Sequence, residues 1–185
     1  MNTMIISAFP ACGKTYLYEI QDELIFKYYG ENRKFSFFDF TSSDYKKDDG
    51  WEKQYVSDLE KKIGTVDFLF ISQYEEILRE LNERNIPFSV VAPSNSEWIS
   101  DNERQLIKQQ WFGRFILRDN SHIKNFEEWL ELLKNKYDEW TSIDHLTKYN
   151  PASFFLLDEN QYLSDIIKDL YWKKENNPNL YCKIN

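Results

Sequence analysis

The chain has 185 residues, with 31 acidic against 23 basic side chains and a formal net charge of -8. This length suits a single domain, and 42% hydrophobic with 17% aromatic residues supply enough apolar surface for a core, which excludes wholesale disorder. The acid excess makes an extended nucleic acid an unfavourable ligand, because such binding depends on Lys and Arg at the phosphates. A local basic site for a small phosphorylated ligand stays compatible with this charge.

The cysteines and histidines are too few for a disulfide framework or a four-ligand structural zinc site: Cys12, Cys182, His122 and His145. We expect both histidines to have structural or surface roles. No apolar run approaches the ~20 residues of a membrane span, and no charged leader precedes the first apolar stretch. The sequence therefore predicts a cytoplasmic protein with no membrane partner.

The segment from residue 3 to residue 15 carries the strongest motif of the chain. A mostly apolar run of strand length (3–7) is followed by Ala8-Phe9-Pro10-Ala11-Cys12-Gly13-Lys14-Thr15, and residues 16–28 suit a helix. This is the pattern of a phosphate-binding P-loop, with Ala8 in place of the first glycine. A tight loop between a buried strand and a helix N-terminus points backbone N–H groups at a phosphate, and the helix dipole favours the anion.

Each residue of the motif has an expected role. Gly13 lets the backbone approach the phosphate, Lys14 reaches the β and γ phosphates, and the Thr15 hydroxyl binds Mg²⁺. The motif predicts ATP and Mg²⁺ as cofactors, with a nucleotide-binding set of Pro10, Ala11, Cys12, Gly13, Lys14, Thr15 and Tyr16. The other interpretation is an accidental turn with a solvated lysine. Cys12 is either loop filler or a reactive thiol whose pKa the helix N-terminus lowers.

A second apolar strand, residues 35–40, ends in Asp39-Phe40-Thr41-Ser42-Ser43. A carboxylate and hydroxyls at the carboxyl end of a strand lie on the ligand-binding edge of an open α/β sheet. Asp39 is therefore a candidate catalytic residue that orients the acceptor, and a candidate Mg²⁺ ligand through water. The alternative is that Asp39 or Ser42 caps or turns the chain before the polar loop that follows.

Three more strands are predicted, at residues 66–71, 87–92 and 154–157, and helical segments lie between the strands. The third strand has an acid near its start, Asp67, and none at its end, so Mg²⁺ would depend on Thr15, phosphates, water and Asp39. Strands that alternate with helices predict an α/β fold with a parallel sheet of about five strands.

Positive charge gathers after Pro93. Two capping-box strings, Ser94-x-x-Glu97 and Ser100-x-x-Glu103, precede a predicted helix that holds three of the six arginines: Arg104, Arg114 and Arg118. Arg114 and Arg118 lie on one helix face and are candidate catalytic residues, since guanidinium groups neutralise charge on a transferred phosphoryl group. The alternative is surface salt bridges to Glu97, Glu103 or Asp119. We expect Trp111 and Phe115 in the core, and helical apolar spacing at residues 126–140 and 162–170 indicates scaffold.

With these residues in view, the chain resembles P-loop nucleoside and nucleotide kinases of the adenylate kinase-like type. It is more similar still to an uncharacterised group of phage and prophage kinase-like proteins. The matching segments are 8–15, 39–43, 68–72, Asn85-Ile86-Pro87, 104–118 and Tyr162-Leu163-Ser164-Asp165-Ile166. Two positions depart from that group's pattern: Thr41 stands in place of a second aspartate, and Asn85 in place of a glycine.

The resemblance implies a three-layer α/β/α P-loop NTPase fold with strand order 2-3-1-4-5. It also implies one domain over residues 1–185, with a lid-like helical insertion at about 94–122, in a bacterial host or phage-infected cell. We expect an ATP-dependent kinase that phosphorylates a nucleoside monophosphate or similar small acceptor. The alternative is a phage-type nucleotide-binding accessory protein that acts through a protein partner without efficient turnover. A homodimer is compatible with either, whereas the charge balance disfavours a polynucleotide-end kinase.

Overall fold

A computed structural model describes residues 2–28, 30–117, 125–177 and 179 of the chain. Arg118, His122 and Cys182 lie outside the described residues, as does the end of the predicted lid segment. No helix in these ranges is both long enough and apolar enough to cross a membrane.

A five-stranded, all-parallel sheet forms the centre of the fold. Its strands in chain order are β1 (Met4–Ala8), β4 (Phe37–Phe40), β5 (Phe68–Ile71), β6 (Ser89–Pro93) and β7 (Ser153–Leu157), and they lie in the order β4-β5-β1-β6-β7. All five strands predicted from the sequence are confirmed, with ends that differ by one or two residues. The three inner strands are buried along their whole length, which explains why they read as unbroken apolar runs.

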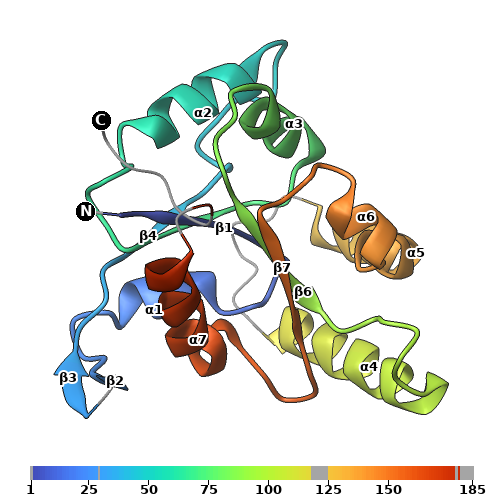
Figure 1. Ribbon diagram of the computed structural model, residues 1–185. Helices are drawn as coiled ribbons and strands as arrows, with labels where there is room; N and C mark the ends of the chain where they lie inside the picture. Colours follow the sequence, from blue (N-terminus) through green and yellow to red (C-terminus); the bar gives the residue numbers. More distant parts are fainter. Residues whose placement is uncertain (1, 29, 118–124, 178, 180–185) are drawn as a thin grey trace.

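Helices flank the sheet, as a three-layer α/β/α arrangement requires. They are α1 (Lys14–Glu19), α2 (Trp51–Glu60), α3 (Glu75–Glu83), α4 (Asp101–Leu117), α5 (Phe126–Trp140), α6 (Ile143–Thr147) and α7 (Leu163–Asn176). Figure 1 shows α2 and α3 together on one side of the sheet, and α1 with α7 on the other. The buried side chains form one continuous apolar cluster between these layers.

The prediction of a helix over residues 16–28 is wrong beyond Glu19, where the helix ends. The chain turns there, and β2 (Phe26–Tyr28) pairs antiparallel with β3 (Glu31–Arg33) in a hairpin. Phe26 leaves the helical path because its ring packs against Phe35, with ring centroids 5.1 Å apart. The Gln21 side chain also accepts a hydrogen bond from the Phe37 backbone N–H at 2.9 Å, which holds the turn against the start of β4.

One of the two capping boxes begins α4. The Ser100 hydroxyl accepts from the Glu103 N–H, and the Glu103 carboxylate accepts from the Ser100 N–H at 2.8 Å. Ser94 begins no helix, because its N–H instead donates to the Leu157 carbonyl at 2.8 Å and continues the pairing of β6 with β7. Trp111 and Phe115 are buried on the inner face of α4, which confirms their predicted place in the core.

A buried ion pair joins the last helix to the sheet. Lys174 of α7 is 1% exposed, and its ammonium donates to the Asp67 carboxylate at 3.1 Å and to the Asn2 carbonyl at 3.0 Å. Asp67, just before β5, also accepts from the Ser36 N–H and hydroxyl at 3.1 and 3.0 Å. The acid at the start of the third strand therefore has a structural partner, and Lys174 belongs to the core although it lies beyond the helical apolar spacing predicted for residues 162–170.

Candidate functional site

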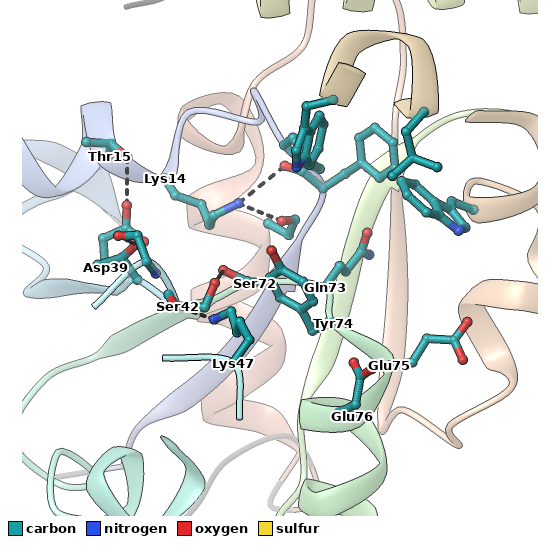
Figure 2. A pocket seen from close by; sticks show the side chains of 18 of the residues that line it. Lys14, Thr15, Asp39, Ser42, Lys47, Ser72, Gln73, Tyr74, Glu75 and Glu76 are labelled. Carbon is teal, nitrogen blue, oxygen red and sulfur yellow. Dashed lines mark hydrogen bonds between the residues drawn. The ribbon is translucent and has the colours of Figure 1, made fainter. Parts of the chain in front are cut away.

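A cavity of about 630 Å³ lies at the carboxyl ends of β1, β4 and β5 (Figure 2). Its lining includes four residues predicted for the site: Pro10, Lys14, Thr15 and Asp39. The carboxyl edge of a parallel sheet is where the loops of different strands converge, so residues far apart in sequence meet here.

The loop between β1 and α1 adopts a backbone conformation with positive φ angles, which glycine adopts without strain. Gly13 has φ 96°, in the left-handed region, and Ala11 also has a positive φ of 62°. The Lys14 ammonium folds back and donates to the Ala8 carbonyl at 2.6 Å and the Phe9 carbonyl at 3.3 Å. Its charge therefore lies over the loop, at the edge of the cavity.

Two other elements hold the loop from outside. The Trp111 indole of α4 donates to the Pro10 carbonyl at 2.8 Å, and the Leu163 N–H at the start of α7 donates to the Cys12 carbonyl at 3.0 Å. A Cβ added to Gly13 would lie 3.6 Å from the Tyr162 ring, in ordinary contact, so the positive φ and not crowding is what favours glycine there. The loop conformation is thus fixed by residues distant in the chain.

Asp39 faces Thr15 across the gap between β4 and α1. The Thr15 hydroxyl donates to the Asp39 carboxylate at 2.7 Å, and both side chains line the cavity (Figure 2). The turn after β4 is made without Asp39, because the Ser43 N–H donates to the Thr41 hydroxyl at 3.3 Å. Asp39 therefore lies beside the loop, and its side chain does not make the turn after β4, whereas the Ser42 carbonyl does take part in that turn by accepting from the Tyr45 N–H at 3.3 Å.

Lys47 was assigned to a polar loop by the sequence, but it lines the cavity. Its ammonium donates to the Ser42 carbonyl and lies 3.7 Å from the centre of the Trp51 ring and 5.0 Å from that of Tyr74. Lys47 is exposed as a residue, and partial desolvation of its ammonium lowers its pKa from the ordinary value, while the charge of Glu76 acts in the opposite direction. No motif in the sequence marks this residue, because its position depends on how the loop folds back toward β5.

The far wall of the cavity comes from α5, α6 and the start of α3. Trp129, Leu132, Trp140 and His145 line it, together with Gln73, Tyr74, Glu75 and Glu76. Helical spacing correctly predicted that α5 has an apolar face, but not that part of this face borders a cavity. Burial lowers the pKa of His145, so its ring is neutral at pH 7.

Arg114 does not line this cavity. Its guanidinium donates to the Gln161 carbonyl at 2.7 Å and lies 4.0 Å from the centre of the Tyr162 ring, beside the loop. The other cations of α4 form surface ion pairs: Arg104 with Asp101, and Lys108 with Asp138 at 2.6 Å. Arg104 thus forms a surface salt bridge, as the alternative interpretation of the arginines expected, but with Asp101 and not with Glu97, Glu103 or Asp119.

The remaining predicted nucleotide-binding residues, Ala11, Cys12, Gly13 and Tyr16, belong to the loop or the first turn of α1 and do not line the cavity. Cys12 is fully buried, and burial raises the pKa of its thiol to about 12. The interpretation of Cys12 as a thiol activated by the helix N-terminus is therefore wrong.

At pH 8, native Cys12 should react with iodoacetamide about 10³-fold more slowly than in the urea-unfolded chain, because only the thiolate reacts and its pKa is raised from 9.0 to about 12. Mass spectrometry of the peptide that contains Cys12 separates this reaction from that of Cys182. Similar rates in the native and unfolded chains would contradict the burial of the thiol.

Comparisons of the chain with protein-family models, with curated proteins and with solved structures find no match. The geometry of the loop and the cavity therefore carries the functional conclusion.

Proposed function

We propose that this chain binds ATP with Mg²⁺ at the loop from Ala8 to Thr15 and transfers the γ-phosphoryl group to a small acceptor in the adjoining cavity. The observation that carries the proposal is the place of Lys14 and Thr15. They follow a left-handed glycine at the carboxyl end of the central strand, and they share a cavity with Asp39. We propose as the acceptor the class expected from the sequence, a nucleoside monophosphate or a similar small molecule.

The order of the sheet supports this assignment. Counted among the parallel strands alone, the order is 2-3-1-4-5, which is the order that the resemblance to adenylate kinase-like proteins implies. The neighbouring strands β1 and β5 are followed by helices on opposite sides of the sheet (Figure 1), so the loops after them diverge. Such a divergence is where open α/β sheets bind ligands.

The oxygen atoms beside the loop suit Mg²⁺ as ligands. This ion prefers oxygen ligands and is usually held by one or two carboxylates together with phosphate oxygens and water. The Thr15 hydroxyl and the Asp39 carboxylate, 2.7 Å apart, offer that set next to Lys14. Since β5 is followed by Ser72 and not by an acid, Asp39 takes the place of the carboxylate that the neighbouring strand lacks. When bound, Mg²⁺ would neutralise negative charge on the phosphates.

The side chains of the chain itself would act by position and charge. Lys14 would exchange its two carbonyl partners for the β and γ phosphates, and Asp39 would orient the acceptor hydroxyl and accept its proton. Arg114 stands beside the loop, where its charge already acts on the Cys12 thiol, and it contributes positive potential without lining the cavity. Arg118 keeps its predicted role as a second guanidinium.

Replacement of Lys14 by alanine is expected to lower ATP-dependent turnover by about 10²–10³-fold, the usual effect of losing one charge-stabilising donor. A coupled assay of ADP release, run over nucleoside monophosphates and small alcohols, measures it. The matched control is Lys27→Ala, an exposed lysine of the β2–β3 hairpin, which should leave turnover unchanged. Full activity in Lys14→Ala would remove the assignment.

A second function, a nucleotide-binding accessory protein that acts through a protein partner, is favoured by the missing acid after β5. Calorimetry distinguishes the two functions. ATP binding that is lost in Lys14→Ala, with no turnover for any acceptor, supports the accessory protein, whereas acceptor-dependent ADP release supports the kinase.

A further inference from the structure

The wall of the cavity opposite the loop is apolar and held in place. Trp129 stacks on Phe115 with ring centroids 5.2 Å apart and an interplanar angle of 16°, which fixes the indole. Trp140 and Leu132 extend the same wall. A rigid aromatic surface of this kind binds the flat apolar face of a ring, and it also attracts a cation.

Polar groups border this wall at the start of α3. Among the described residues, the Gln73 amide and the Glu76 carboxylate have no hydrogen-bond partner, and Figure 2 shows both at the cavity. Glu75 accepts from the Tyr149 hydroxyl and pairs with Lys148 at 3.2 Å. The Tyr149 hydrogen bond is the largest cause that lowers the pKa of Glu75, so this carboxylate is ionised at neutral pH. The end of the cavity thus offers hydrogen-bond acceptors and negative charge.

The lysines that line the cavity, Lys14 and Lys47, both have other partners. Lys14 would hold the phosphates of ATP, and the Lys47 ammonium lies against the Ser42 carbonyl and the Trp51 ring. His145 is neutral at pH 7 because burial lowers its pKa. No arginine in the described ranges lines the cavity. A phosphate on the acceptor would therefore add negative charge next to Asp39 and Glu76, and such like-charge contacts disfavour a ligand.

We infer that the acceptor is an alcohol that bears a ring and an amino group and carries no phosphate. This inference rests on the proposed function and narrows its acceptor. The ring lies on the wall formed by Trp129 and Trp140, and the amino group donates to Glu76. Two sources share this chemistry, amino sugars and nucleosides with an exocyclic amine, and the experiment separates them.

The transfer balances with ATP as the only co-reactant. The acceptor hydroxyl oxygen forms a bond to the γ-phosphorus, and the bond from that phosphorus to the β–γ bridging oxygen breaks. The bridging oxygen leaves with the electron pair as part of ADP. The hydroxyl proton passes to the Asp39 carboxylate and then to water, and the product is a phosphate monoester of the alcohol.

The test measures ADP release and the phosphorylated product, by mass spectrometry, for the full chain with ATP and Mg²⁺. One set of acceptors is glucose, glucosamine and glucosamine 6-phosphate, and the other is uridine, cytidine and cytidine 5′-monophosphate. Within the set that matches the acceptor, the amine-bearing alcohol should react fastest and its phosphorylated counterpart slowest. The set that reacts identifies the source.

Replacement of Glu76 by glutamine should raise the KM for the amine-bearing acceptor by about 10–100-fold, the effect of weakening one charged hydrogen bond, while the KM for its amine-free counterpart stays the same. Glu83→Gln, an exposed acid at the other end of α3, is the matched control and should change neither value. An unchanged preference for the amine in Glu76→Gln would overturn the role of this residue.

Faster transfer to cytidine 5′-monophosphate than to cytidine, or ATP binding without transfer to any of the alcohols, would overturn the inference. Calorimetry with ATP and Mg²⁺ separates this failure from that of the proposed function. A chain that binds ATP and phosphorylates only the monophosphate keeps the proposed function, whereas a chain that binds no ATP removes both.

Discussion

Replacement of Asp39 by asparagine is expected to lower the turnover of phosphoryl transfer by about 10²–10⁴-fold, the range associated with loss of a general base. The amide oxygen can still accept the hydrogen bond that the Thr15 hydroxyl donates at 2.7 Å, so the local structure should be kept. What is lost is the group that accepts the proton of the acceptor hydroxyl, together with one negative ligand for Mg²⁺.

The control for this variant is Asp49→Asn, an exposed aspartate in the loop before α2, whose turnover should equal that of the wild-type chain. ADP release at saturating acceptor gives the turnover, and thermal unfolding checks that the variants are folded. A folded Asp39→Asn chain with wild-type turnover would show that Asp39 has neither role.

Replacement of Lys174 by alanine is expected to lower the free energy of unfolding by about 3–5 kcal/mol, as for other buried ion pairs that lose one partner. The reason lies with the residue that stays behind. Asp67 would keep its bonds from Ser36 but lose the ammonium 3.1 Å away, so a largely buried carboxylate would have no cation. Urea unfolding at pH 7 measures the change.

Lys173→Ala is the matched control, since the neighbouring lysine is exposed and, among the described residues, its ammonium lies over the Phe155 ring at 4.2 Å without an ion pair. It should change the free energy of unfolding by about 1 kcal/mol or less. A double variant, Lys174→Met with Asp67→Asn, removes both charges and should recover part of the stability that Lys174→Ala loses. Equal losses in Lys173→Ala and Lys174→Ala would contradict the buried pair.

The three inner strands of the sheet could be predicted because buried parallel strands must be apolar along their whole length. The edge strands β4 and β7 are only partly buried, and each was identified from a short aromatic and aliphatic run. The loop at Gly13 could be predicted for a similar reason, since the conformation and the chemistry depend on neighbouring residues. The location of Asp39 at the edge of the sheet could be predicted because this residue lies at the end of a strand. These features are local in sequence, or follow from the common direction of parallel strands.

The rest depends on contacts between segments far apart in the chain. Nothing near Phe26 shows that its ring will leave the helix to meet Phe35, and nothing near Lys174 shows that Asp67 will lie beside it. Helical spacing identified an apolar face on α5, but it could not show that Trp129 and Trp140 would face a cavity at the end of β1. Spacing gives the direction of a side chain, whereas tertiary packing decides what lies opposite.

The central place of the first strand has a consequence for synthesis of the chain. Met4 pairs with Phe68 and Ala8 with Val91, so β1 leaves the ribosome well before either neighbour exists. Until then an apolar strand with two unpaired edges is exposed, the condition under which nascent chains aggregate or recruit chaperones. The high sequence separation of these pairs should also make folding slow compared with helical proteins of the same size. The position that places the loop at the centre of the sheet thus leaves the N-terminal strand without any neighbour until β5 is made, and without its second neighbour until β6 is made.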